Sequence, residues 1–275
     1  MYRGEPQAKP GIATSRRNFL AGGLLVGSTM AALFSTRRVE AQGINTGPEP
    51  GCSPSGNQPN KCVCLLAGTR IQTPNGQVPI ESLRIGDLVT TVSGASKPVK
   101  WIGRMRFTRE PRGAWRSDVV PVKIARFALN GETPHKELFL SPAHALYFNG
   151  LLIPVKHLIN RHSITEYQSS DLYILQYYHV ELSSHDVIFA EGAPVETYQA
   201  NANRQAFDNA EEYFERYGVE DSPMAPFAPI ISLNGGRQEL WSRIRSVVSP
   251  IYDRRRPLDV IRDEIADRAE YRNAA

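Results

Sequence analysis

Residues 64–69 read CLLAGT, and the chain continues much later with SPAH at residues 141–144 and with His185. Each of these three positions lies at the edge of a β-like segment. A thiol attacks a carbonyl only as thiolate, and an amide leaves only when its nitrogen is protonated. One cysteine with two histidines is therefore a minimal set of groups for acyl transfer.

The stretch from Cys64 to Val92 resembles the opening block of Hint domains, the self-processing module shared by hedgehog proteins and inteins. Residues 141–144 look like the Thr-x-x-His block of that family, with serine in place of threonine, and His185 to Tyr198 resembles its closing block. The three blocks occur in the family's order over residues 64–198. Within the family, the resemblance is closest to the bacterial hedgehog/intein-like subgroup.

The resemblance implies an N-to-S acyl shift at the bond between Val63 and Cys64. Cys64 would attack the carbonyl carbon of Val63 and convert the peptide bond into a thioester. His144 would carry a proton between the sulfur and the leaving nitrogen, which suits a histidine pKa near ~6.5. Ser141 would hold the scissile carbonyl or the imidazole by its hydroxyl, and His185 would act later or from the opposite side.

Full splicing would also need an asparagine at the carboxyl end of the module, followed by Cys, Ser or Thr. The closing block instead ends in residues 196–199, ETYQ, and Asn201 and Asn203 are followed by Ala202 and Arg204. Sterol transfer, as in hedgehog proteins, is not expected because the charged carboxyl-terminal part shows no extended apolar surface. The expected substrate is the protein's own N-terminal segment, the acceptor is water, a thiol or an amine, and no cofactor is needed.

Two other functions remain open. One is a Hint-derived structural or surface-interaction module in which the chemistry is dormant. The other is a cysteine hydrolase that acts on other proteins, which is disfavoured because the sequence offers no recognisable substrate-binding motif or oxyanion glycine cluster.

The other histidines and two aspartates are assigned structural roles. Asp87 is expected to accept hydrogen bonds in a turn, and Asp186 should point to the strand face opposite His185. The histidines outside the recognised blocks are expected at surface or core positions; they are His135, His157, His162 and His179.

Residues 1–41 are typical of a twin-arginine export signal, because Arg16 and Arg17 precede a mildly apolar stretch that runs to Phe34. Glycines interrupt this stretch, and it falls short of the ~20 apolar residues that a membrane span needs. Small residues at the cleavage position predict a cut between Ala41 and Gln42. The mature protein is therefore expected in the periplasm or outside the cell, with no membrane contact after signal removal.

The formal charge of +4 does not predict a nucleic-acid partner. Six of the 32 Lys and Arg residues, but only two of the 28 Asp and Glu residues, lie in the leader. The mature chain is therefore charge-balanced and lacks the basic excess that would release counterions from DNA or RNA.

Three cysteines in an exported chain leave one unpaired if the other two form a disulfide. Cys52 and Cys62 flank a polar loop and could pair, which would leave Cys64 as the free nucleophile. A pair of Cys62 and Cys64 is poorer because one intervening residue strains the bond. A zinc site from the three cysteines and a histidine is the competing interpretation, but the histidines lack zinc-finger spacing, so no metal is expected.

The predicted fold class is all-β, with a helical C-terminal appendage. Short apolar runs separated by turn residues extend from Thr69 to Ala190, and Asn149-Gly150 between two of them is a hairpin signal. Short strands without long helical patterns between them indicate an all-β body, and the resemblance implies two related β subdomains. Residues 42–63, rich in Gly, Pro, Asn and Ser, are expected to be a flexible lead-in.

Residues 199–275 carry helical patterns. Helices are predicted over Arg204–Tyr217, over Gln238–Val248 and from Pro257 onward. The apolar stripe of the second helix is interpreted as a packing face; it consists of Leu240, Trp241, Ile244, Val247 and Val248. We therefore expect a helical covering or a small partner-binding appendage, whose protein partner the sequence does not specify.

Overall fold

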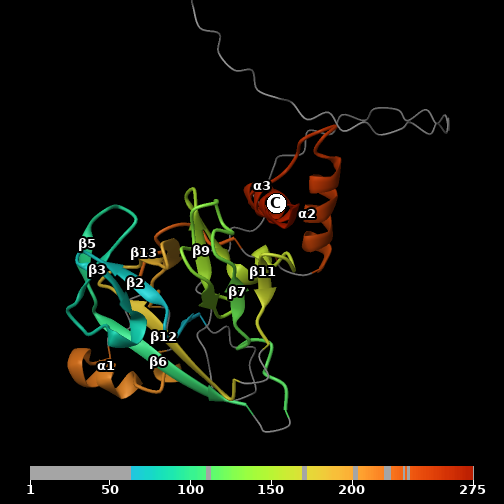
Figure 1. Cartoon of the computed structure of the whole chain (residues 1–275). Helices are drawn as coiled ribbons and strands as arrows, with labels where there is room; N and C mark the ends of the chain where they lie inside the picture. Colours follow the sequence, from blue (N-terminus) through green and yellow to red (C-terminus); the bar gives the residue numbers. More distant parts are fainter. Residues whose placement is uncertain are drawn as a thin grey trace, which may run out of the picture. The chain divides into compact units, whose positions relative to one another are not determined.

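Two six-stranded sheets make up the β body, and strands from distant parts of the chain alternate in them (Figure 1). The strand order is β11-β7-β8-β1-β12-β6 in the first sheet and β10-β9-β14-β13-β2-β3 in the second, while β4 and β5 form a separate pair. All strand pairings in these sheets are antiparallel. The mostly β architecture in two subdomains, with helices at the C-terminal end, confirms the predicted fold class.

This computed structural model describes residues 63–109, 113–168, 172–200, 204–219, 224–231, 233 and 236–274. The predicted leader, the cleavage site at Ala41 and Gln42, and the Cys52–Cys62 pair lie outside these residues. The strands are β1 (Leu65–Leu66), β2 (Arg70–Thr73), β3 (Gly76–Pro79), β4 (Leu88–Thr90), β5 (Ser96–Pro98), β6 (Trp101–Thr108), β7 (Val122–Ile124), β8 (Leu138–Leu140), β9 (Ala145–Phe148), β10 (Leu151–Pro154), β11 (Ile164–Glu166), β12 (Ile174–Glu181), β13 (Val187–Ala190) and β14 (Ala193–Glu196). The α-helices are α1 (Ala210–Tyr217), α2 (Gly236–Val248) and α3 (Pro257–Ala274).

The hairpin signal at Asn149-Gly150 is confirmed. These two residues join β9 to β10 with φ values of 45° and 88°, the left-handed conformations that a two-residue turn of this kind requires. The turn fixes the register of β9, which begins directly after His144. The position of His144 at the start of a strand therefore follows from local sequence.

Strand β6 is the edge of the first sheet, and the segment before α1 covers that edge. The backbone N–H groups of Arg104 and Arg106 donate to the side chains of Asn209 and Asp208, both at 2.7 Å. Figure 1 shows α1 alongside β6. The edge groups that would otherwise be open to another strand are thus satisfied within the chain.

A buried ion pair ties β12 to the residues after the last strand. The guanidinium of Arg204 donates to both carboxylate oxygens of Glu181, at 3.0 and 2.8 Å, and lies over the Tyr213 ring at 4.0 Å. Trp101 packs edge-on against Tyr213 in the same cluster. Because two charges are withdrawn from water here, their geometry has to be good for the pair to be tolerated.

The C-terminal helices differ from the prediction in two respects. The first begins later than expected, at Ala210 after a short 3-10 turn (Arg204–Ala206), and ends as predicted at Gly218, whose φ is 69°. The apolar stripe of α2 is not a packing face: its five residues are all exposed. Instead α3 supplies the apolar contact, since Leu258, Ile261 and Ile265 join the main buried core.

In the described residues, no helix has the length and apolar character to cross a membrane.

Removing Glu181 should destabilise the protein far more than removing an exposed acid. Glu181→Ala leaves the buried Arg204 guanidinium without its carboxylate counter-charge, which should lower the free energy of unfolding by about 3–5 kcal/mol. The control is Glu137→Ala, which breaks the exposed 3.1 Å pair with Lys123 and should cost only about 0–1 kcal/mol. Urea unfolding of both variants measures the difference, and equal costs would contradict the role given to the buried pair.

Candidate active site

Cys64 immediately precedes β1, a strand inserted between β8 and β12. Leu65 lies opposite Leu140 on one side and opposite Tyr178 on the other. Continuing both registers by one residue places Cys64 opposite Ser141 and His179. Directly opposed residues of antiparallel strands share a sheet face with Cβ atoms ~5 Å apart, so the three side chains are neighbours.

Two hydrogen bonds hold Cys64 against Ser141. The backbone N–H of Cys64 donates to Ser141 Oγ at 2.8 Å, and the N–H of Ser141 donates to the Cys64 carbonyl at 2.9 Å. The Cys64 nitrogen belongs to the Val63–Cys64 peptide bond, so the Ser141 hydroxyl lies at the amide nitrogen of that bond. Both residues are fully buried.

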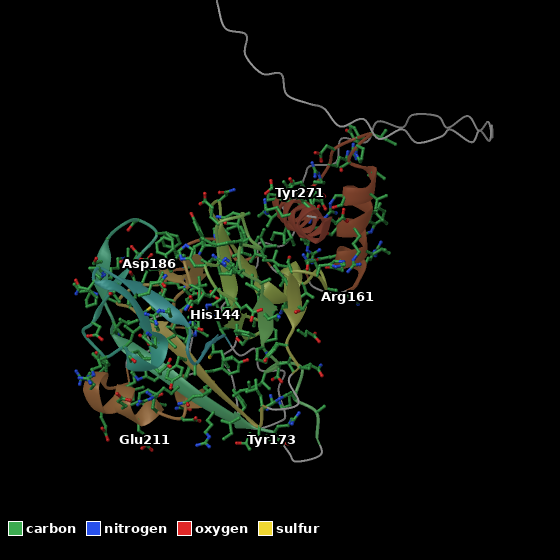
Figure 2. All side chains as sticks on the ribbon, in the orientation of Figure 1. His144, Arg161, Tyr173, Asp186, Glu211 and Tyr271 are labelled. Carbon is green, nitrogen blue, oxygen red and sulfur yellow. The ribbon has the colours of Figure 1, made fainter. Side chains whose placement is uncertain are left out.

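His144 follows Ser141 through a tight turn. Its backbone N–H donates to the Ser141 carbonyl at 3.1 Å, and its ring lies 5.2 Å from the ring of His179, centroid to centroid. The His179 ring in turn meets Tyr198 edge-on at 5.4 Å. Figure 2 shows His144 in the interior of the β body, whereas Tyr173 and Glu211 lie at its periphery. His144 thus packs against His179, the residue that the continued β1–β12 register places opposite Cys64.

Burial sets the protonation states of this site. It raises the pKa of the Cys64 thiol far above its usual range, because thiolate is poorly solvated among apolar neighbours. It lowers the pKa of His144 to about 4, against the opposing attraction of the Glu196 carboxylate. Burial, with a smaller contribution from His144, also lowers the pKa of His179 well below its usual range. At neutral pH the thiol and these two imidazoles are therefore all uncharged.

His185 approaches the site from the closing block. Its Nδ1 accepts a hydrogen bond from the backbone N–H of Phe227 at 3.0 Å, and its Nε2 lies 3.7 Å from Glu196 Oε2. The other Glu196 oxygen accepts from the N–H of Ala145 at 2.7 Å. Glu196 therefore connects His185 to the residue that directly follows His144.

His179 and Glu196 are functional candidates that sequence reasoning missed. His179 was assigned a plain surface or core position because no recognised motif surrounds it. Glu196 was considered only as a departure from the splicing pattern. The signal that identifies His179 is its register opposite Cys64, and strand register between residues more than 100 positions apart cannot be read from one sequence.

The structural roles assigned to the two aspartates are confirmed. Asp87 Oδ2 accepts a hydrogen bond from the N–H of Arg84 at 2.8 Å within a turn. Asp186 forms an ion pair with Lys97 at 2.5 Å and takes no part in the imidazole cluster. Of the remaining histidines, His135 and His162 are exposed and His157 is buried outside the site.

The thiol also borders an aromatic cluster. Cys64 belongs to the buried group that contains Trp101, Tyr177 and Tyr198. The Tyr177 hydroxyl donates to the carbonyl of Val119 at 2.7 Å, which holds this ring in place. Among the described residues, no group of three or more His, Cys, Asp or Glu side chains could hold a metal ion.

Comparison with solved structures finds inteins and an intein-like domain. The gp41-1 intein is 17% identical, with a TM-score of 0.35, and the match covers 48% of this chain and 96% of that one. A DnaB intein from Synechocystis sp. PCC 6803 is 10% identical, with a TM-score of 0.35 and coverages of 49% and 99%. A bacterial intein-like domain from Clostridium thermocellum is 15% identical, with a TM-score of 0.29 and coverages of 50% and 99%.

No curated protein matches the chain. The model of the Hint domain family matches residues 63–202, a range that begins at the residue before Cys64 and includes Ser141, His144, His179 and His185. The match spans half of the chain and contains both sheets of the β body. The protein therefore belongs to the Hint domain family.

Proposed function

We propose that this Hint domain cleaves its own chain by an N-to-S acyl shift at Val63–Cys64 and passes the resulting thioester to water, a thiol or an amine, without splicing. One observation carries the proposal: the N–H of Cys64 donates to Ser141 Oγ at 2.8 Å. A hydroxyl at the nitrogen of this peptide bond, in a β body that also buries His144 and His179, is suited to breaking the bond.

The first step converts the peptide bond into a thioester. The Cys64 sulfur forms a bond to the carbonyl carbon of Val63 while its proton passes to a neutral imidazole. The bond from that carbon to the Cys64 nitrogen then breaks, and the nitrogen takes the proton back from the imidazolium. Attack by water, a thiol or an amine on the thioester releases the N-terminal segment and restores the Cys64 thiol.

His179 and His144 are the candidates for this proton transfer. The continued β1–β12 register places His179 opposite Cys64, and the His144 ring packs against the His179 ring. Both are neutral at neutral pH, which is the form that accepts a proton from a thiol. The Glu196 carboxylate favours the charged form of His144 and would stabilise the imidazolium once it forms. His185 contacts the same carboxylate and is proposed to assist the later cleavage of the thioester.

Ser141 is proposed to assist departure of the nitrogen. In the planar amide the nitrogen has no free lone pair, so its N–H donates and Ser141 Oγ accepts. When the tetrahedral intermediate forms, the nitrogen gains a lone pair, and the same hydroxyl is placed to donate to it. An interaction that becomes stronger in the transition state is one that accelerates the reaction.

Complete burial favours the chain's own segment over an external substrate. Cys64, Ser141 and His144 have no exposed surface, so a second polypeptide would have to open the β body to reach the thiol. The residue that precedes Cys64 needs no access path because it is covalently attached. This is why a hydrolase acting on other proteins is the weaker proposal.

A dormant Hint-derived structural or surface-interaction module is the second candidate. The observation that favours it is the raised pKa of the Cys64 thiol, because a buried neutral thiol is a poor nucleophile unless a base acts at the moment of attack. In either case we propose export by the twin-arginine route to the periplasm or beyond, on the basis of residues 1–41 of the sequence.

Self-cleavage should depend on the Cys64 sulfur. Incubation of the purified full-length chain with a small thiol should yield a fragment that starts at Cys64, detected by intact mass and N-terminal sequencing. Cys64→Ala should yield no such fragment because no thioester can form. An intact parent chain after prolonged incubation would favour the dormant module instead.

Replacing Ser141 or His179 should slow cleavage but not abolish it, because the Cys64 thiol is still present. Ser141→Ala removes one neutral hydrogen bond and should slow thioester formation about tenfold. His179→Gln removes a proton acceptor and should slow it about 100-fold. The exposed His162→Gln serves as the matched histidine control. Cleavage of His179→Gln at the parent rate would show that His179 is not the base.

The buried neutral His144 should make the fold less stable in mild acid. Its pKa of about 4 lies below the ~6.5 of an unfolded histidine, so the unfolded state binds more protons and stability falls as pH drops from about 6.5 toward 4. Between pH 7 and pH 5 this residue should remove about 2 kcal/mol from the free energy of unfolding. Urea unfolding of His144→Gln should lack that part of the pH dependence, and an unchanged slope would contradict the assignment.

A further inference from the structure

Helix α2 meets the rest of the protein through its polar side. Ser242, which is buried, hydrogen-bonds to Asp259 of α3, and Arg245 pairs with the same carboxylate at 2.6 Å. Glu239 pairs with Arg262 of α3 at 2.9 Å. The groups that a surface helix usually turns toward water are here used for packing.

The opposite side of α2 is apolar and open. With about 100° of rotation per residue, the side chains of its apolar stripe fall on one arc, facing away from Ser242. Ile251 and Tyr252, which follow the helix, are two further exposed hydrophobic side chains. We call this set the α2 face: Leu240, Trp241, Ile244, Val247, Val248, Ile251 and Tyr252, with exposed fractions from 38% to 91%.

The residues around the α2 face are basic. Arg237 at its start and Arg254 and Arg256 at its end are exposed, and none has an acidic side-chain partner within the described parts of the chain. Arg243 flanks the face and is held only by an exposed 3.3 Å pair with Glu239. The acidic groups nearby are directed toward α3 or toward other arginines, as in the 2.7 Å pair of Asp253 with Arg255. The α2 face is therefore an apolar surface with a positive border.

We infer that the α2 face binds the surface of a membrane that contains anionic lipids, with α2 lying in the plane of the interface. A helix with leucine, valine and tryptophan on one side and arginines at its border is suited to this position. The apolar side chains enter the boundary of the acyl chains, Trp241 and Tyr252 occupy the headgroup level, and the arginines pair with lipid phosphates. This inference is independent of whether Cys64 is active.

A second copy of the chain fits the α2 face less well. A symmetric contact would bring the same patch from two chains together and would place the two sets of border arginines close to each other. An anionic surface removes that repulsion and supplies the missing counter-charges. The charge pattern therefore selects the lipid surface as the occupant.

The inferred membrane contact and the exposed α2 face differ from two expectations drawn from the sequence. We expected no membrane contact after signal removal, and no extended apolar surface in the C-terminal part. The first was drawn from the leader and its removal, and the second from the charged residues of the C-terminal part. The structure buries apolar residues of α3 instead and leaves those of α2 uncovered.

The test uses the full-length protein and vesicle flotation. The protein should float with vesicles of phosphatidylcholine and phosphatidylglycerol, bind vesicles of phosphatidylcholine alone at least tenfold more weakly, and lose affinity as salt is raised. Val247→Asp, which places a carboxylate in the middle of the α2 face, should reduce binding at least tenfold. The matched control is Val219→Asp, since Val219 is also a highly exposed valine, at 83%, but lies after α1.

A second variant tests the charged border and a third the depth of insertion. The triple change Arg237→Gln, Arg254→Gln and Arg256→Gln should weaken binding several-fold and flatten its salt dependence. Tryptophan emission should shift to shorter wavelength on addition of anionic vesicles, and Trp241→Phe should remove that shift while binding persists.

Three results would overturn the inference. The first is no flotation with anionic vesicles at low salt. The second is flotation that Val247→Asp leaves unchanged, because binding would then come from another part of the chain. The third is a dimer in sedimentation experiments that Val247→Asp dissociates, because a second copy would then be the occupant. Circular dichroism and urea unfolding should show the same fold in all variants, since the changed side chains are exposed.

Discussion

The insertion of a two-residue strand between β8 and β12 is the constraint on which the candidate site depends. β1 pairs through Leu65 with both neighbours, and this pairing fixes the backbone of Cys64 at the point where the chain enters the body. The two hydrogen bonds between Cys64 and Ser141 continue the same interaction by one residue. The nitrogen of the peptide bond before Cys64 is thus held by Ser141.

The central position of β1 makes the thiol and the two imidazoles of the site neutral. Because β1 is a central strand, the residue before it is buried with it, and burial disfavours thiolate and imidazolium alike. The carboxylate of Glu196 is the nearby charge that offsets this for His144. In the proposed reaction, a neutral thiol would attack only while a base removes its proton. The same burial is what a dormant module would show, so the two proposals share one architecture.

The C-terminal residues contribute to the body in more than one way. Arg204 provides the counter-charge for buried Glu181, the N–H of Phe227 donates to His185, and α3 adds apolar side chains to the core. At these three places the C-terminal residues pack on the β body. Only α2 departs from that role, because its polar side is used for packing and its apolar side remains outside.

The sequence by itself determined the all-β class, the β9–β10 hairpin, the helix that ends at Gly218 and the identity of Cys64, Ser141 and His144 as residues of one family pattern. These follow from local rules: turn residues with positive φ, apolar runs, and short motifs. Only the tertiary structure decided that Ser141 contacts the nitrogen of the Val63–Cys64 bond, that His144 packs against His179, and which side of α2 is buried. Those features depend on the register between distant strands and on which apolar helix packs on the core, and neither is encoded in residues that are close in sequence.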